Sequence, residues 1–169
     1  MVNEHRFPMG PLEVSCLSTH GIWDEAVRVL LSTYDVRSPP PVCQGLSLRI
    51  TQGTPPYTAV QDQGGWGDAA FLPVEGGVYE CNGHFWYALL EGFETGYGMV
   101  ANFAMREEIE DLAHAVNSLR AVLNCATSAA LVHEDSLLLH ACAMLHPSGE
   151  HAALFLGPSG AGKSTMTRR

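Results

Sequence analysis

The sequence feature that most constrains the fold is the segment GPSGAGKS at residues 157–164, which directly follows the apolar run of residues 152–156. The segment matches the pattern GxxxxGK[ST] in full, with its glycines, lysine and serine at the required spacing. The residues after it are compatible with a helix. A short apolar strand, a glycine-rich loop and a helix in this order predict an α/β fold in which the strand leads into the loop.

A loop of this pattern is suited to binding the phosphates of a nucleotide. Glycines at positions 157, 160 and 162 allow the backbone to turn tightly and to direct several N–H groups at one point. Lys163 would reach the β- and γ-phosphates, Ser164 would take one position on Mg²⁺, and Thr165 could stabilise the helix start or touch the α-phosphate. The expected cofactors are ATP and Mg²⁺, with Ser164 as the residue on the metal. The expected nucleotide-binding residues are Gly157, Pro158, Ser159, Gly160, Ala161, Gly162, Lys163, Ser164 and Thr165.

The charge distribution supports an anion-binding end on an acidic protein. The net charge is −9, which argues against a nucleic acid or an anionic membrane surface as the main partner. Residues 151–169 nevertheless contain no acidic residue and hold one lysine and two arginines. Lys163 is the only lysine of the chain, against eight arginines, and a compact ammonium is not interchangeable with a planar guanidinium.

The composition predicts a cytoplasmic protein with reduced thiols. No apolar run approaches the roughly 18 residues that a membrane-spanning helix needs. The first ten residues, MVNEHRFPMG, contain an acid and a proline and lack the apolar stretch of a secretory signal. The five cysteines are odd in number, widely spaced and without a CxxC pair, so neither a disulfide framework nor a zinc site is expected.

Hydrophobic periodicity divides the chain into a β-rich region, residues 1–104, and a region from 105 to 169 that contains the loop. The long helix expected at residues 105–133 has apolar residues at steps of three or four and acids in its first turns, where the helix dipole favours them. Residues 137–145 and 152–156 read as two adjacent buried strands. In the first region we expect a helix at 23–34, a two-residue turn at 82–83, and strands at 12–18, 46–51, 69–74, 78–81, 84–91 and 98–103.

The segment LLHACAML at residues 138–145, the short turn, residues 152–156 and the sequence GPSGAGKST together resemble the HPr serine kinase/phosphorylase family. The likeness is strongest to its shorter relatives in peptide-maturation gene cassettes, and it covers residues 105–169. It implies an α/β kinase core similar to phosphoenolpyruvate carboxykinase and ATP-dependent phosphorylation of a serine on a small protein or peptide. It also gives His140 the position of the family's strand histidine, whereas the residue by itself favours a hydrogen-bonded core histidine.

The sequence departs from this family after the loop, because it stops six residues beyond Lys163. A kinase of this type also needs an acid that orients Mg²⁺ and a base that accepts the serine proton, which the family places after the loop. We therefore expect an incomplete kinase core, either a fragment or a truncated product without catalytic power. The alternatives are another phosphate-loop ATPase or nucleotide kinase, and a non-enzymatic module whose first hundred residues bind a peptide or protein.

Overall fold

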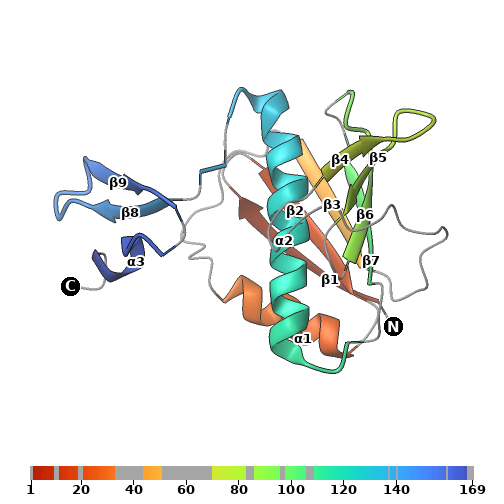
Figure 1. The fold of residues 1–169 in the computed structure, drawn as a ribbon, viewed down its shortest axis with the longest axis horizontal. Coiled ribbons are helices and arrows are strands. Elements are labelled where there is room, and N and C mark those ends of the chain that lie inside the picture. Colours follow the sequence, from red (N-terminus) through yellow and green to blue (C-terminus); the bar gives the residue numbers. More distant parts are fainter. Residues whose placement is uncertain are drawn as a thin grey trace. The chain divides into compact units, whose positions relative to one another are not determined.

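A computed structural model gives the chain a mixed α/β fold, as the sequence predicts (Figure 1). The structure describes residues 2–9, 12–18, 21–32, 44–50, 70–82, 86–95, 98–105, 109–136, 138–139, 141–158 and 160–166. The chain divides into two compact units, Met1–Leu137 and Leu138–Arg169. The first unit contains a sheet with two long helices, and the second contains a strand pair and the glycine-rich loop.

The sheet of the first unit has seven strands in the order β1-β2-β3-β7-β6-β5-β4. The pairs β2–β3 and β3–β7 are parallel, and the other neighbours are antiparallel. Helix α1 connects the parallel strands β2 and β3, which makes a β-α-β unit. The strands are β1 (Asn3–Met9), β2 (Leu12–Ser18), β3 (Gln44–Ile50), β4 (Ala70–Pro73), β5 (Tyr79–Asn82), β6 (Trp86–Glu91) and β7 (Val100–Met105).

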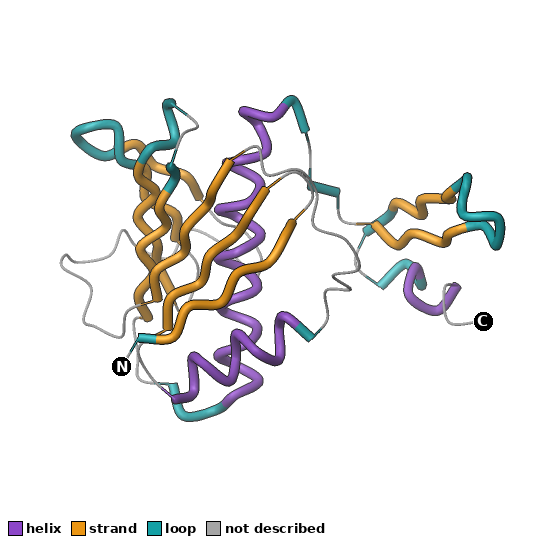
Figure 2. The backbone as a smooth tube through the Cα atoms, turned by 180° about the vertical axis from the view of Figure 1, so that it is seen from behind, coloured by secondary structure: helices purple, strands orange, loops and turns teal. Residues whose placement is uncertain are grey.

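Two helices, α1 (Gly21–Leu31) and α2 (Leu112–Leu131), pack against each other and against the sheet. Figures 1 and 2, seen from opposite sides, show α2 crossing one face of the strands. Asp111 caps α2, because its carboxylate accepts hydrogen bonds from the backbone N–H groups of Ala113 (3.2 Å) and His114 (3.3 Å). A short 3₁₀ turn, η1 (Val132–Glu134), follows the helix.

The core lies between the helices and the sheet face that they cover. Every second residue of β2 is buried, as the period of a strand with one covered face requires. Phe103 of β7 lies at its centre, with its ring centroid 5.4 Å from that of Trp23 on α1 and 6.3 Å from that of Trp86 on β6. These ring contacts join α1, β6 and β7 in one hydrophobic core.

Most of the predicted elements are present. The strands expected at 12–18 and 152–156 have the predicted bounds, and the other expected strands overlap observed ones. Strand β1 was not predicted, because its polar residues and its proline interrupt the alternation of apolar and polar residues by which a strand is recognised. The expected turn at 82–83 lies partly outside the described residues.

The long helix begins at residue 112 rather than 105, and it belongs to the first unit. The units therefore divide at 137/138, whereas the sequence indicated a division at 104/105. The physical reason is that α2 buries its apolar side chains against α1, β2, β3 and β6.

In the second unit, β8 (Ala141–Leu145) and β9 (Ala152–Leu156) form an antiparallel pair, followed by the loop and the one-turn helix α3 (Lys163–Met166). The prediction that these strands are adjacent is confirmed, but the prediction that they are buried is wrong. Their apolar side chains are largely exposed, with Leu145 at 70% and Leu156 at 65%. A two-stranded sheet has two open faces, and in the described part of the unit the one-turn helix α3 contacts β8 but leaves these side chains exposed.

Candidate functional site

The candidate site is the glycine-rich loop that joins β9 to α3. The chain leaves β9 at Leu156 and turns back within a few residues, with the backbone N–H of Ala161 donating to the carbonyl of Pro158 (3.2 Å). Gly160 and Gly162 have φ angles of +83° and +79°, in the left-handed region that favours glycine. The N–H of Thr165 then donates to the carbonyl of Gly162 (3.0 Å), which closes the first helical turn. The glycines at 160 and 162 are therefore required by the backbone that the loop adopts.

Lys163 folds back over the beginning of this loop. Its ammonium Nζ donates hydrogen bonds to the carbonyl oxygens of Gly157 (2.7 Å) and Pro158 (2.8 Å), and the residue is only 9% exposed. An ammonium has three N–H donors, so this arrangement uses two and leaves one. The lysine thus fastens the beginning of the loop to its end. Its third N–H and its positive charge remain at the loop.

Among the described residues, the Lys163 ammonium contacts backbone carbonyl oxygens and no carboxylate. The ion pairs found within the described ranges all lie in the first unit, and none includes this lysine. A buried ammonium bound only to neutral oxygens favours the approach of an anion, because no carboxylate competes for its charge. The donor set of the loop therefore fits a phosphate group.

The other predicted site residues are placed only in part. Gly157 is half-buried, and the residues exposed to solvent are Pro158, Gly160, Ala161, Gly162 and Thr165. Ser164 lies in α3, but the structure does not describe its side chain. Ser159 and His140 are outside the described residues. Hydrogen bonds thus bring together Gly157, Pro158 and Lys163. Across the described residues no three His, Cys, Asp or Glu side chains gather to hold a metal ion.

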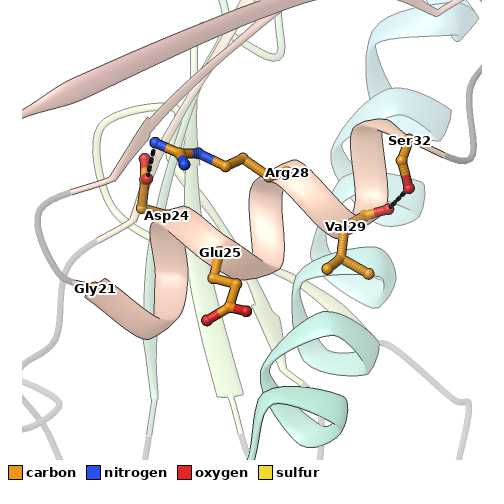
Figure 3. Close-up of a pocket in the computed structure, with 6 residues that line it drawn as sticks. All are labelled: Gly21, Asp24, Glu25, Arg28, Val29 and Ser32. Carbon is orange, nitrogen blue, oxygen red and sulfur yellow. Dashed lines mark hydrogen bonds and ion pairs between the residues drawn. The ribbon is translucent and has the colours of Figure 1, made fainter.

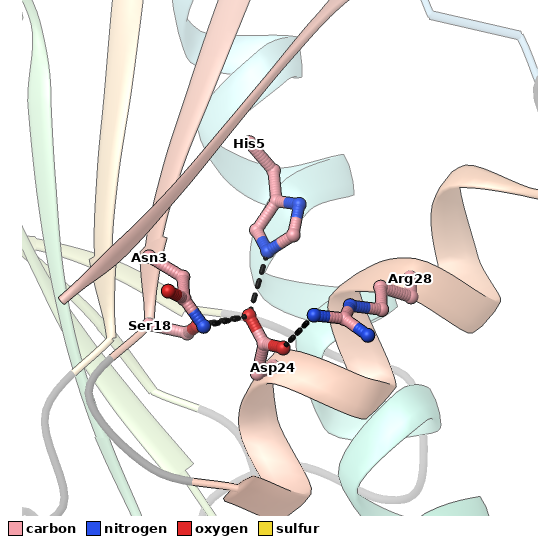
Figure 4. A network of polar contacts seen from close by, with 5 residues as sticks. All are labelled: Asn3, His5, Ser18, Asp24 and Arg28. Carbon is pink, nitrogen blue, oxygen red and sulfur yellow. Dashed lines mark hydrogen bonds and ion pairs between the residues drawn. The ribbon is translucent and has the colours of Figure 1, made fainter. Parts of the chain in front are cut away.

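A second polar cluster, which the sequence did not predict, surrounds Asp24 in the first turn of α1 (Figure 4). Asp24 Oδ1 accepts hydrogen bonds from Asn3 Nδ2 (2.9 Å) and Ser18 Oγ (3.1 Å) and lies 2.7 Å from His5 Nε2. Its Oδ2 pairs with Nη2 of Arg28 at 2.8 Å. The hydrogen bonds from His5 and Asn3, with those of Ser18 and the Arg28 charge, lower the pKa of Asp24 to about 2.

The Asp24 cluster connects the first helix to the edge of the sheet. Both carboxylate oxygens are engaged by protein donors, so they tie α1 to β1 and β2. Beside it lies a cavity of about 540 Å³, lined by Gly21, Asp24, Glu25, Arg28, Val29 and Ser32 (Figure 3). The Ser32 hydroxyl on this wall donates to the carbonyl of Val29 (2.7 Å). No spacing in the sequence could have revealed the cluster, because its members come from three separate elements.

No protein-family model matches the chain, and neither a curated protein nor a solved structure is similar to it at the level required for a match. None of the described helices is long and apolar enough to cross a membrane.

Proposed function

We propose that this chain binds Mg²⁺-ATP at residues 157–165 and is the nucleotide-binding part of a serine kinase similar to HPr kinase. The core would be of the phosphate-loop type found in that family, and the acceptor would be a serine on a small protein or peptide. One observation carries the proposal: the buried Lys163 ammonium is held by the carbonyls of Gly157 and Pro158, and no acid of the described ranges pairs with it.

The residues of the loop divide the binding of a triphosphate between them. Lys163 supplies the positive charge and its remaining N–H to the β- and γ-phosphate oxygens. The turns at Gly160 and Gly162 leave room for phosphate oxygens, since an added Cβ at either position would meet nothing within 4 Å. Ser164 would give its hydroxyl oxygen to Mg²⁺. When bound, the metal ion neutralises charge on the phosphoryl group during transfer.

Phosphoryl transfer to serine also needs a base for the hydroxyl proton. The described side chains of the loop offer a lysine ammonium and a threonine hydroxyl, and neither accepts a proton readily. The loop therefore accounts for nucleotide binding and for charge stabilisation. The resemblance to HPr kinase supplies the choice of serine as acceptor.

Calorimetric titration of the whole chain with ATP, with and without Mg²⁺, tests the proposal. We expect Mg²⁺-dependent binding that Lys163→Ala weakens about thirtyfold or more, because one to two charge-assisted hydrogen bonds and a charge are lost. Arg120→Ala is the matched control, since it removes one positive charge from an exposed position on α2 in the other unit. Equal ATP affinity in Lys163→Ala and the wild type would overturn the proposal.

A transfer assay separates the kinase from another phosphate-loop ATPase. ATP labelled at the γ-phosphate is incubated with the protein and with serine-containing peptides, and with the same peptides carrying alanine for serine. Label on the serine peptides alone supports the kinase. Release of inorganic phosphate without labelled peptide would favour an ATPase and contradict the choice of acceptor.

A further inference from the structure

The turn that joins β8 to β9 carries a histidine on each side. The backbone N–H of His146 donates to the carbonyl of His151 (2.8 Å), which extends the antiparallel register by one pair beyond Leu145 and Ala152. Residues opposite one another in an antiparallel pair place their side chains on the same face. Both imidazoles therefore lie on one face of the hairpin, with their ring centroids 6.5 Å apart.

Hydrogen bonds within the turn hold the ring of His146. Its Nδ1 contacts the backbone N–H of Ser148 at 3.2 Å and the Ser148 Oγ at 2.9 Å. Ser148 Oγ also accepts the N–H of Glu150 (3.3 Å), and the carbonyl of His146 accepts the N–H of Gly149 (2.8 Å). Because Nδ1 is engaged inside the turn, Nε2 is the ring nitrogen that can bind a ligand from outside. A ring oriented through its other nitrogen is typical of histidines that bind metals.

The surroundings of the two rings leave them open to solvent. His146 and His151 are both exposed. Within the part of the chain that the structure describes, neither ring pairs with a carboxylate, and the ring of His151 makes no hydrogen bond. No third His, Cys, Asp or Glu of the described residues joins them in a group that could hold a metal ion. The pair can therefore supply two nitrogen ligands, and water would supply the others.

We propose that His146 and His151 bind one divalent transition-metal ion of the Zn²⁺ class, through Nε2 of His146 and one ring nitrogen of His151. Imidazole suits Zn²⁺, Cu²⁺ and Ni²⁺, whereas Mg²⁺ prefers oxygen ligands. Zn–N bonds of about 2.1 Å place two rings on one ion with their centroids about 5–6.5 Å apart. The observed 6.5 Å lies at the upper end of this range, so a small rotation of exposed side chains completes the site. In the bound form Nδ1 of His146 carries the proton and donates it to Ser148 Oγ.

This site is separate from the glycine-rich loop of the same unit. The five residues of β9 lie between them, a length of about 16 Å in an extended strand. The metal would act on the hairpin itself. A two-stranded sheet is only marginally stable in water, and an ion held by one histidine from each strand favours the paired strands by mass action.

The test is a titration of the whole chain, labelled with ¹⁵N in its histidines, with zinc chloride in the absence of nucleotide. Long-range ¹H–¹⁵N spectra report each imidazole separately. We expect the ring-nitrogen signals of His146 and His151 to shift together and to saturate at one Zn²⁺ per chain. Two ligands instead of the four of a structural zinc site predict a Kd of about 1–100 µM. Magnesium chloride at the same concentrations should leave both signals in place.

His151→Ala is the informative variant, because it removes one ligand while its backbone carbonyl still pairs with His146. We expect the Zn²⁺ concentration at the midpoint of the His146 shift to rise about tenfold or more. His133→Ala is the matched control, since it removes an exposed histidine from η1 in the other unit and should leave the midpoint unchanged.

Two results with the wild-type protein would overturn the proposal. One is the absence of a shift of both signals at about 1 mM Zn²⁺, well above the expected Kd. The other is a shift of only one of the two histidines, which would show that they do not share an ion. Neither result depends on ATP binding, so failure of this proposal and failure of the proposed function are distinguishable.

Discussion

Replacing Gly162 by alanine should weaken nucleotide binding through the backbone alone. Gly162 has φ +79°, and an added Cβ would meet nothing within 4 Å, so no steric collision accompanies the change. Only the cost of a left-handed conformation for an L residue remains, about 1–2 kcal/mol. If residue 162 of the free variant relaxes to a negative φ, ATP binding must restore the left-handed conformation. The free energy that this costs weakens ATP binding by about 5- to 30-fold.

Gly157→Ala is the matched control for this prediction. Gly157 belongs to the same sequence pattern, but its φ is not positive and an added Cβ would meet only the Cβ of Ala161 at 3.4 Å, an ordinary contact. We expect its ATP affinity to stay within about twofold of wild type, since the added methyl group costs little. Gly162→Asn should fall between the two, because asparagine tolerates the left-handed region better than alanine does.

The assay is calorimetric titration of the three variants and the wild type with Mg²⁺-ATP under one set of conditions. Circular dichroism would show that the folded first unit is unchanged in each. The reasoning is refuted if Gly157→Ala loses as much affinity as Gly162→Ala. It is refuted equally if Gly162→Ala binds as the wild type does.

Three predictions concern the first unit, each measured by urea unfolding followed by tryptophan fluorescence. Phe103→Ala should lower the free energy of unfolding by about 3–5 kcal/mol, because the ring is fully buried between two tryptophans. Phe103→Leu should lower it by less than about 1.5 kcal/mol. Equal losses in the two variants would contradict this packing. Asp111→Ala should cost about 1 kcal/mol through loss of the α2 cap, and Asp111→Asn much less. The pKa of Asp24, about 2 against an ordinary 3.8, means that its network stabilises the fold above pH 3.8 and that this stabilisation is lost as the pH falls towards 2. The stability difference between wild type and Asp24→Asn should therefore shrink over that interval, and a constant difference would argue against the network.

Local patterns predicted the elements that depend on local sequence. Strand β2 was found because its alternation reflects one covered face, and β9 because its apolar run ends at the glycine-rich loop. Strand β1 escaped prediction, because its seven residues include three charged or imidazole side chains and a proline. It is a strand because the edge of β2 offers it a full set of backbone partners.

Tertiary context decided what the sequence could not predict. The burial of β8 and β9 depends on which layers cover them, and their apolar residues do not encode that. The Asp24 cluster depends on the meeting of β1, β2 and α1. In the loop, the spacing predicted the positions of the glycines and of Lys163. The carbonyl partners of the lysine could be identified only from the three-dimensional structure.

The most direct measurement of the central claim uses the fact that Lys163 is the only lysine of the chain. An amine-reactive ester can modify only Lys163 and the N-terminal amine, and mass spectrometry of the two peptides reports each rate separately. With Mg²⁺-ATP at about ten times its Kd, we expect Lys163 to react about tenfold more slowly and the N-terminal amine to react at an unchanged rate. Equal rates of Lys163 modification with and without saturating Mg²⁺-ATP would contradict nucleotide binding at this loop.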